Sequence, residues 1–479
     1  MSAVFGRFLA HGYLPHFLTV AGFLLAFFMV ARLIGEKRAP ANTFAWLLGI
    51  ILIPYVGVPL YLIFGGRKLR RLAGRKAPVV PTLKRPRPHP PQPPAAPAVA
   101  DTVVSAGGCP PVDGNRFRLL ATGEEDFLAL EKHIREARHS IHITTFILGR
   151  DETARRLVDL LAQRARDGVK VRLLLDALGC LVSSTYFVNP LRKAGGEVGR
   201  FMPVLPFGSR TSANLRIHRK IAVFDHNTAM IGGRNLARDY MGPLPYRRRW
   251  RDLGAVIEGP AAALLNQVFI ADWCFATRQE EAKLRAEIPE QAAQPVGPSE
   301  LQVVASGPDV PGDPLYEGII AMIQEAEKSI LIVTPYFIPD EVLLRSLMVK
   351  ARAGRDVVLV LPARSNHPLT DFARRYYTRE LVRAGARVML YGEHMLHAKA
   401  VIVDDRVALI GSANFDLRSL FVNFEIGVFA HSEPDVRALR EWARGLMQQC
   451  RKATPSADRR RGLLGNLAED LSRLLAPLL

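Results

Sequence analysis

A short pattern of chemically active residues occurs twice in this chain of 479 residues. Each copy has a histidine and a lysine two positions apart, followed by an aspartate, a glycine and an asparagine. The spacing of these residues is the same in both copies. The matching side chains are His218, Lys220, Asp225 and Asn235 in the first copy and His397, Lys399, Asp404 and Asn414 in the second. Residues two apart on a strand point to the same face. Each copy is therefore expected to present an imidazole and an ammonium group side by side.

Two such sets facing one another would supply what transfer of a phosphodiester group requires. One histidine can attack phosphorus while the other protonates the leaving oxygen from the opposite side. Fixed donors can hold the non-bridging oxygens, and the candidates are Lys220, Lys399, Asn235, Asn414 and Ser412. Because two ammonium groups can be aimed at one phosphate, we expect neither a metal ion nor another cofactor. Ser412 stands where the first copy has Gly233, so the two copies are expected to have unequal roles.

The doubled motif resembles the phospholipase D superfamily, and the flanking sequence is similar to that of the bacterial cardiolipin synthases. The resemblance covers nearly the whole chain. It implies an α/β fold of two pseudo-symmetric sandwich halves with the active site between them. It also implies that one histidine becomes a phosphohistidine while the other acts as acid and then as base. His218 is favoured as the nucleophile, but the two motif copies are nearly symmetric and do not decide between it and His397.

A histidine in either role needs an acceptor on its second ring nitrogen. An acidic residue follows each motif in a corresponding place, Asp252 after the first and Glu425 after the second. The family resemblance makes these the expected orienting carboxylates; without it, each would be read as a surface or salt-bridge carboxylate. Asp225 and Asp404 belong to the catalytic motif, but we expect them to bond the backbone or a neighbouring base rather than to transfer protons.

The rest of the chain repeats on the scale of a domain. The sequence Glu136-Ala-Arg-His-Ser-Ile141 recurs as Glu325-Ala-Glu-Lys-Ser-Ile330, each time where a helical stretch runs into a strand. Alternating strands and helices, with glycine closing the helices, predict an α/β fold with a largely covered sheet. We place the first half at 116–295 and the second at 296–450.

Residues 1–76 are predicted to form a membrane hairpin. Two apolar stretches, with spans at about 14–34 and 43–64, are each long enough to cross the hydrocarbon core of a bilayer. Pro54 suggests that the second span is kinked or re-entrant. Basic residues are more numerous outside the turn than within it. This distribution places both termini, and the catalytic domain with them, on the cytoplasmic side of a bacterial inner membrane.

Two further segments and the net charge complete the organisation of the chain. Residues 77–115 include a proline-rich run and are predicted to be an extended linker. Residues 451–479 are predicted to form a basic amphipathic tail that lies on the membrane or packs on the domain. The chain has 64 Lys and Arg against 45 Asp and Glu, a formal charge of +19. That excess favours an anionic partner, either a nucleic acid or a lipid surface.

From the resemblance we expect a cardiolipin synthase. One phosphatidylglycerol would donate its phosphatidyl group to the enzyme, and a second would accept it to give cardiolipin and glycerol. The expected partners are phosphatidylglycerol and anionic membrane lipids, and the oligomeric state is left open. A phospholipase D that hydrolyses lipid or uses another alcohol is the first alternative. A nuclease is a weaker one, because the two apolar spans and the lack of a base-reading module argue against nucleic acid as a partner.

Overall fold

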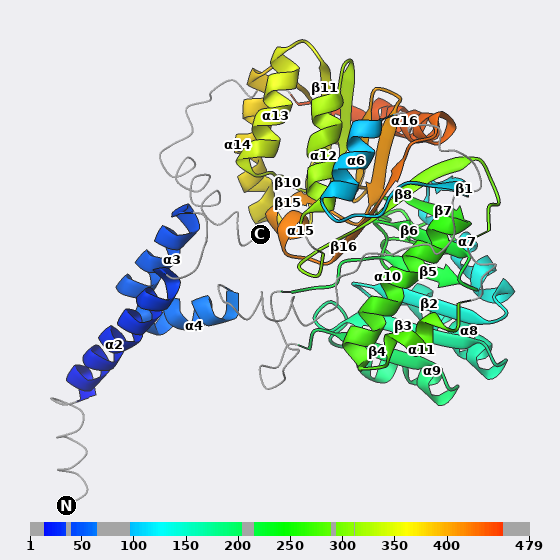
Figure 1. The fold of residues 1–479 in the computed structure, drawn as a ribbon, viewed down its shortest axis with the longest axis horizontal. Helices are drawn as coiled ribbons and strands as arrows, with labels where there is room; N and C mark the ends of the chain where they lie inside the picture. Colours follow the sequence, from blue (N-terminus) through cyan, green and yellow to red (C-terminus); the bar gives the residue numbers. More distant parts are fainter. Residues whose placement is uncertain are drawn as a thin grey trace, which may run out of the picture. The chain divides into compact units, whose positions relative to one another are not determined.

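The computed structural model describes residues 14–34, 40–64, 96–203, 215–288, 294–310 and 312–453. These residues belong to two compact units (Figure 1). One unit contains the N-terminal helices and the other contains an α/β body with both motif copies.

The N-terminal unit consists of α2 (Leu14–Ile34), α3 (Pro40–Leu52) and α4 (Pro54–Phe64). The second apolar stretch of the sequence is thus divided into two helices at Pro54, whose ring lacks the N–H that a continuous helix needs. Many apolar side chains on these helices are exposed, Phe23 to 74% and Phe27 to 68%. Within the described part of the chain, no helix combines the length and the apolar character needed to cross a membrane.

Strands and helices alternate in both halves of the α/β body, as the sequence predicts. The first half contains β1 (Val112–Leu120), α7 (Gly123–Glu136), β2 (Ser140–Thr145), α8 (Glu152–Arg166), β3 (Lys170–Asp176), α9 (Asn189–Lys193), β4 (Glu197–Phe201), β5 (Ile221–Phe224), β6 (Thr228–Gly232), β7 (Gly254–Glu258), α10 (Pro260–Thr277) and α11 (Glu281–Arg285). The second contains β8 (Ser299–Ser306), α12 (Pro314–Glu325), β9 (Ser329–Val333), α13 (Glu341–Arg352), β11 (Asp356–Pro362), α14 (Pro368–Arg383), β12 (Arg387–Tyr391), β13 (Ala400–Val403), β14 (Val407–Gly411), α15 (Leu417–Phe421), β16 (Glu425–Ala430), α16 (Glu433–Gln448) and β17 (Cys450–Lys452).

One sheet runs through both halves, and the antiparallel pair β1–β8 lies at its centre. Outward from β1 the order is β7, β6, β5, β2, β3 and β4, and outward from β8 it is β16, β14, β13, β9, β11, β12 and β17. Each strand of the first half therefore has a counterpart at the same distance from the centre. Figure 1 shows the two halves meeting at β1 and β8. A separate short pair, β10 (Phe337–Ile338) with β15 (Phe415–Asp416), lies beside the second motif.

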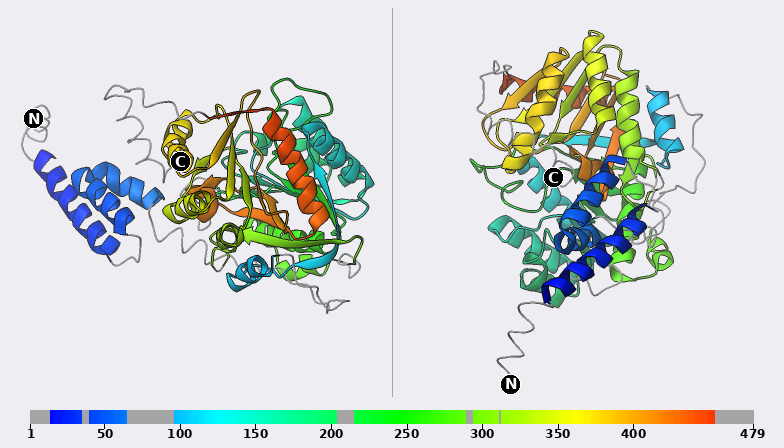
Figure 2. Two further views of the ribbon diagram at one scale, coloured as in Figure 1. Left: turned by 90° about the horizontal axis from the view of Figure 1, so that it is seen from above. Right: turned by 90° about the vertical axis from the view of Figure 1, so that its left-hand side faces the viewer.

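The largest hydrophobic cluster is shared between the halves. It includes Leu264 and Val268 of α10 together with Leu439 and Leu446 of α16 and side chains from the central strands of both halves. Figure 2 shows α16 as a long helix against the strands. Helix α10 is buried over almost its whole length, which is why its sequence shows no amphipathic period. The shared core fixes the two halves to each other. Because a packed core deforms little, the site between the halves is held rigidly as well.

The linker predicted over 77–115 is shorter than expected. Helix α6 (Pro97–Ser105) buries Val99 and Val103 in the core of the second half, and β1 begins at Val112. Two valines four positions apart form a helical apolar stripe, which the proline-rich run before it obscures in the sequence.

The boundary at 450 also moves, because β17 adds residues 450–452 to the sheet. The remainder of the linker and the tail from 454 lie outside the described residues.

A tight turn ends each motif strand, and the motif aspartate stands in it. Asp225 and Asp404 have φ values of 47° and 53°, a left-handed conformation that aspartate tolerates better than most residues. The Asp225 carboxylate accepts hydrogen bonds from the main-chain amides of residues 138–140 at 2.7–2.9 Å. Asp404 accepts from the amides of residues 327–329 in the same way. Both aspartates thus make the backbone contact expected of them, anchoring the β5–β6 and β13–β14 hairpins to β2 and β9.

We predict that Asp225→Ala lowers the free energy of unfolding by about 3 kcal/mol, because three main-chain amides lose their acceptor. Urea denaturation in detergent measures the change. Asp159→Ala, which removes an exposed carboxylate from α8, is the matched control and should stay within about 0.5 kcal/mol of the unsubstituted chain. Equal stability of the two variants would contradict the anchoring role of Asp225.

Candidate active site

The segments that carry the two histidines lie just before β5 and β13, and each is bonded to the other half. Ile217 forms a parallel bridge with Phe424, and Leu396 forms one with Arg251. The main-chain N–H of His218 donates to the Phe424 oxygen at 2.9 Å, and that of His397 donates to the Arg251 oxygen at 2.7 Å. The residues after Phe424 and Arg251 are Glu425 and Asp252. The two bridges therefore place His218 next to Glu425 and His397 next to Asp252, each an acid of the opposite half.

The side chains follow the same crossed pattern. Nδ1 of His218 lies 2.9 Å from Oε1 of Glu425, and Nδ1 of His397 lies 2.7 Å from Oδ2 of Asp252. Both carboxylates are almost completely inaccessible to solvent, at 0% and 1% exposure. A carboxylate on Nδ1 favours the tautomer in which Nδ1 carries the proton, and this leaves Nε2 as the reactive nitrogen. The sequence indicated these four residues but not which acid serves which histidine.

A buried lysine accompanies each histidine. Nζ of Lys220 donates to the main-chain oxygen of His218 at 2.8 Å, and Nζ of Lys399 donates to that of His397 at 2.5 Å. Nζ of Lys399 also lies 2.8 Å from Nδ1 and 3.1 Å from Nε2 of the His397 ring. Both lysines are less than 5% exposed. Burial disfavours the charged form and lowers the pKa of Lys220 to about 7 and that of Lys399 to about 8. Two ammonium groups that are poorly hydrated are well suited to hold an anion between them.

Burial sets the charge of the two imidazoles, and neighbouring groups set the charge of the two carboxylates. Burial lowers the pKa of His218 to about 4 and that of His397 to about 3, which keeps both imidazoles neutral near pH 7. Burial alone would raise the pKa of Asp252, but His397 and Lys399 outweigh it and hold that pKa below its usual range. The pKa of Glu425 is likewise lowered, by His218 and Lys220 against the effect of burial. The site therefore has two neutral imidazoles and two charged carboxylates.

Asn235 and Asn414 are each bonded to residues of their own half, while Ser412 is placed differently from our expectation. The side-chain oxygen of Asn235 accepts the N–H of Ile147 at 3.1 Å, and Asn414 is bonded to Asp416. The hydroxyl of Ser412 is fully buried and donates to Oε2 of Glu425 at 2.5 Å. It supports a carboxylate rather than facing a phosphate.

The counterpart of Ser412, Gly233, explains why the two copies differ here. A Cβ at Gly233 would lie 2.2 Å from Oδ1 of Asp252, so the shorter acid occupies the space that a serine side chain would need. The Asp252 carboxylate approaches the main chain directly, whereas that of Glu425 is met by a hydroxyl. Gly233 is therefore required by a close approach and not by a turn.

Aromatic rings enclose the histidines, and sequence reasoning missed them. The rings of Tyr240 and Trp250 lie 5.2 and 5.3 Å from that of His397, and Phe146 lies 5.2 Å from His218. Trp250 stands two positions before Asp252, so strand alternation could have placed it on the same side. Phe146 and Tyr240 had no such signal, because they come from loops that only the fold brings close. The rings limit the access of water to the imidazoles.

Comparison with protein families identifies two matching families. The family described as "Cardiolipin synthase, PLD-like domain" matches residues 130–273 and 319–447. The family described as "Phospholipase_D-nuclease N-terminal" matches residues 24–66. The first match contains both motif copies and both orienting acids.

Curated relatives align over almost the entire chain. The cardiolipin synthase of Geobacillus kaustophilus is 34% identical over 461 residues, covering 93% of this chain and 90% of its own. That of Listeria monocytogenes is 31% identical over 490 residues, covering 98% of this chain and 100% of its own. Among solved structures, the phosphatidylserine synthase of Haemophilus influenzae superimposes with a TM-score of 0.58 at 16% identity, covering 80% of this chain and 100% of that one. This last similarity concerns the fold alone.

We predict a bell-shaped pH dependence of kcat/KM for a phosphodiester substrate. The acid limb lies near pH 4, because His218 must be neutral to attack, and the basic limb lies near pH 7–8, where Lys220 and Lys399 lose their protons. Glu425 raises the pKa of His218, so Glu425→Gln should move the acid limb to lower pH. Limbs at the ordinary values of about 6.5 and 10.4 would contradict the assignment.

Proposed function

The chain belongs to the bacterial cardiolipin synthases of the phospholipase D superfamily, and we propose that its paired site transfers the phosphatidyl group of one phosphatidylglycerol to another. The products are cardiolipin and glycerol. One observation carries this proposal: each imidazole is bonded to a buried carboxylate of the other half and has a buried lysine beside it. Such a pair can bind phosphorus covalently and can move a proton to and from two successive alcohols.

In the first step, Nε2 of His218 attacks phosphorus of the donor lipid. A P–N bond forms, the P–O bond to the terminal glycerol breaks, and the glycerol oxygen takes a proton from Nε2 of His397. The anionic phosphodiester and Asp252 favour the protonated form of His397 in the complex. Lys220 and Lys399 stabilise the charge on the non-bridging oxygens. The products of this step are free glycerol and a phosphatidyl-histidine.

In the second step, the terminal hydroxyl of another phosphatidylglycerol attacks the phosphohistidine. Nε2 of His397, now neutral, takes the hydroxyl proton, and the P–N bond breaks to release cardiolipin. His218 returns to its neutral form, and His397 is again protonated for the next cycle. Asn235 and Asn414 help to hold the phosphoryl group through both steps. The aromatic rings of Tyr240, Trp250 and Phe146 restrict water at this stage, which favours transfer to an alcohol over hydrolysis.

The N-terminal helices are proposed to attach the enzyme to the membrane from which its lipids come. The arrangement that we propose is the hairpin predicted for 1–76, with the catalytic unit on the cytoplasmic face. Its support is the match of residues 24–66 to a family N-terminal region and the apolar side chains exposed on α2 and on α3–α4. Exposed phenylalanines on a helix surface are costly in water and favourable in lipid.

The transfer is tested with purified protein in micelles containing labelled phosphatidylglycerol. The unsubstituted chain should yield cardiolipin and an equal amount of glycerol, and His218→Ala and His397→Ala should each lower the rate by at least about 10³-fold. His394→Ala is the matched control, because His394 is exposed although it stands only three residues before His397. The rate of this variant should equal that of the unsubstituted chain.

The products distinguish this function from its rivals. Phosphatidic acid as the main product would replace the synthase with a phospholipase D hydrolase that uses the same residues. A chain that turns over no phospholipid but cleaves DNA would instead be a nuclease. Formation of cardiolipin by His218→Ala and His397→Ala at the unsubstituted rate would remove the paired site from the mechanism.

Membrane attachment is tested by flotation with vesicles that contain anionic phospholipid. The unsubstituted chain should float even in about 0.5 M salt, because apolar attachment is not screened as charge attraction is. Phe23→Lys with Phe27→Lys should lower the floated fraction, since each lysine costs about 3 kcal/mol in the hydrocarbon core. Leu128→Lys, on the exposed face of α7, is the control and should float like the unsubstituted chain. Release of the unsubstituted chain by salt would contradict the apolar anchor.

A further inference from the structure

Two arginines within the first motif copy have no counterpart in the second. Arg219 stands between His218 and Lys220, and Arg234 stands immediately before Asn235. The second copy has Ala398 and Ala413 in these positions. Both arginines are buried, at 0% and 5% exposure, and neither takes part in the two chemical steps. Buried guanidinium groups are costly unless every donor is used, so their partners indicate what they are for.

Arg219 points away from His218 and Lys220 and binds the main chain of Glu425. Its Nε donates to the Glu425 oxygen at 2.9 Å, and Nη2 donates to the Ser306 oxygen at 3.1 Å. Glu425 and Ser306 are direct partners in the β16–β8 register. One planar guanidinium therefore clamps the two strands at the residue whose carboxylate holds His218. Asp272 of α10, at 2.6 Å, and Asp309, at 3.4 Å, balance its charge.

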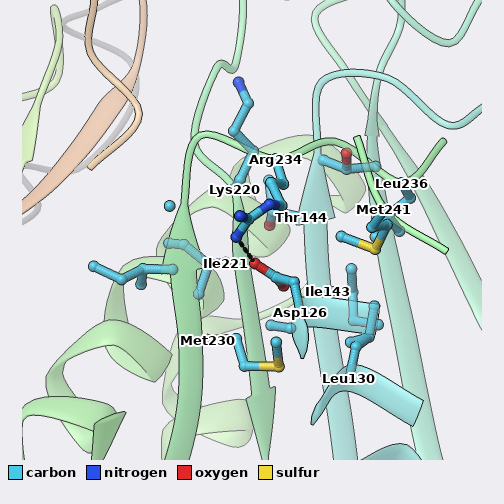
Figure 3. A pocket seen from close by; sticks show the side chains of 14 residues that line it. Asp126, Leu130, Ile143, Thr144, Lys220, Ile221, Met230, Arg234, Leu236 and Met241 are labelled. Carbon is cyan, nitrogen blue, oxygen red and sulfur yellow. Dashed lines mark hydrogen bonds and ion pairs between the residues drawn. The ribbon is translucent and has the colours of Figure 1, made fainter. Parts of the chain in front are cut away.

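Arg234 makes the corresponding contacts to Asp252. Its Nη2 donates to the main-chain oxygen of Asp252, and Nη1 donates to the Leu120 oxygen at 3.2 Å. Leu120 lies opposite Gly254 in the β1–β7 register, two residues from Asp252. Asp126 of α7 forms the balancing ion pair with Nη1, drawn as a dashed line in Figure 3.

We propose that Arg219 and Arg234 are positioning residues, which fix the two carboxylates and through them the two imidazoles. Arg219 acts on His218 through Glu425, and Arg234 acts on His397 through Asp252. The proposal rests on the function proposed above. Both arginines belong to the first half, so that half supports the orienting acids on both sides of the site. The second half supplies only alanine at the equivalent points.

The physical reason is the precision that in-line transfer requires. An imidazole that must attack phosphorus and another that must meet the leaving oxygen tolerate errors of well under an ångström. A carboxylate can orient its histidine only if its own main chain is held. Two hydrogen bonds from one rigid guanidinium to paired strand carbonyls provide this restraint, and a lysine could not donate to both in the same plane.

The rival interpretation is that these arginines only stabilise the fold. Measurements of kcat, KM and the pH profile distinguish this interpretation from a positioning role. Arg219→Met is combined with Asp272→Asn so that the closer buried carboxylate is not left unpaired. We expect kcat for cardiolipin formation to fall about tenfold or more, with KM within about twofold. The acid limb of the pH profile should move to lower pH, in the direction expected for Glu425→Gln, because the Glu425 carboxylate is no longer held against His218. Unchanged kcat and an unchanged profile alongside a lowered melting temperature would overturn the proposal.

A double-substitution cycle tests the route through Glu425. If Arg219 acts through that residue, adding Glu425→Gln to the Arg219→Met/Asp272→Asn variant should cost little further in kcat. Losses that multiply would mean independent roles and would overturn the proposal. For Arg234, the same cycle is run with Arg234→Met/Asp126→Asn and Asp252→Asn.

Two further variants keep the outcome decisive. Arg219→Lys retains the charge in case the methionine variant does not fold; we expect a several-fold loss of kcat, and an unsubstituted rate would overturn the proposal. Arg172→Met with Glu287→Gln removes another ion pair of the first half, between buried Arg172 and partly buried Glu287. Arg172 contacts His142 rather than His218 or His397, so this variant should lower the melting temperature while kcat and the pH profile remain unchanged. If the unsubstituted chain itself forms no cardiolipin, it is the proposed function that fails.

Discussion

The hydrogen bonds that cross between the halves, from His218 to Glu425 and from His397 to Asp252, are the interactions on which the rest of the structure depends. Neither half contains a complete catalytic unit, because each holds an imidazole whose acceptor belongs to the other. All four groups are buried, so removing one partner leaves the other buried without it, at a cost of several kcal/mol. The site can therefore exist only as a product of the assembled body.

The fold meets this requirement because the two halves share one continuous sheet and one hydrophobic cluster. The central pair β1–β8 makes one sheet of two repeats, and the cluster that includes α10 and α16 fills a single core on both sides of that pair. A packed interior has few alternative arrangements. The two imidazoles stand in segments just before β5 and β13 that are bonded to the opposite half, so strand pairing and core packing restrain their positions. For the proposed transfer, in which two lipids meet one phosphorus in turn, this rigidity would hold the proposed nucleophile and acid in fixed positions.

Repetition has nevertheless been followed by specialisation. In the first copy, Gly233 admits Asp252 against the main chain, and two arginines clamp the acids. In the second copy, Ser412 completes the hydrogen bonding of Glu425. Each imidazole thus has a carboxylate on Nδ1, but the residues around the two carboxylates differ. Such differences are what one expects where one histidine carries the phosphoryl group and the other carries the proton.

The sequence by itself determined the α/β halves and the two His-Lys pairs, because these depend on local spacing and strand or helix period. The two acids were expected only from the family resemblance. The sequence also indicated the backbone role of Asp225 and Asp404, which stand at strand ends. Only the tertiary structure decided that each acid serves the opposite histidine, since the two assignments have identical spacing along the chain. The aromatic walls, the contact of Ser412 with Glu425 and the partners of Arg219 were decided there too. Each joins residues far apart in sequence, and no local pattern encodes which of them will meet.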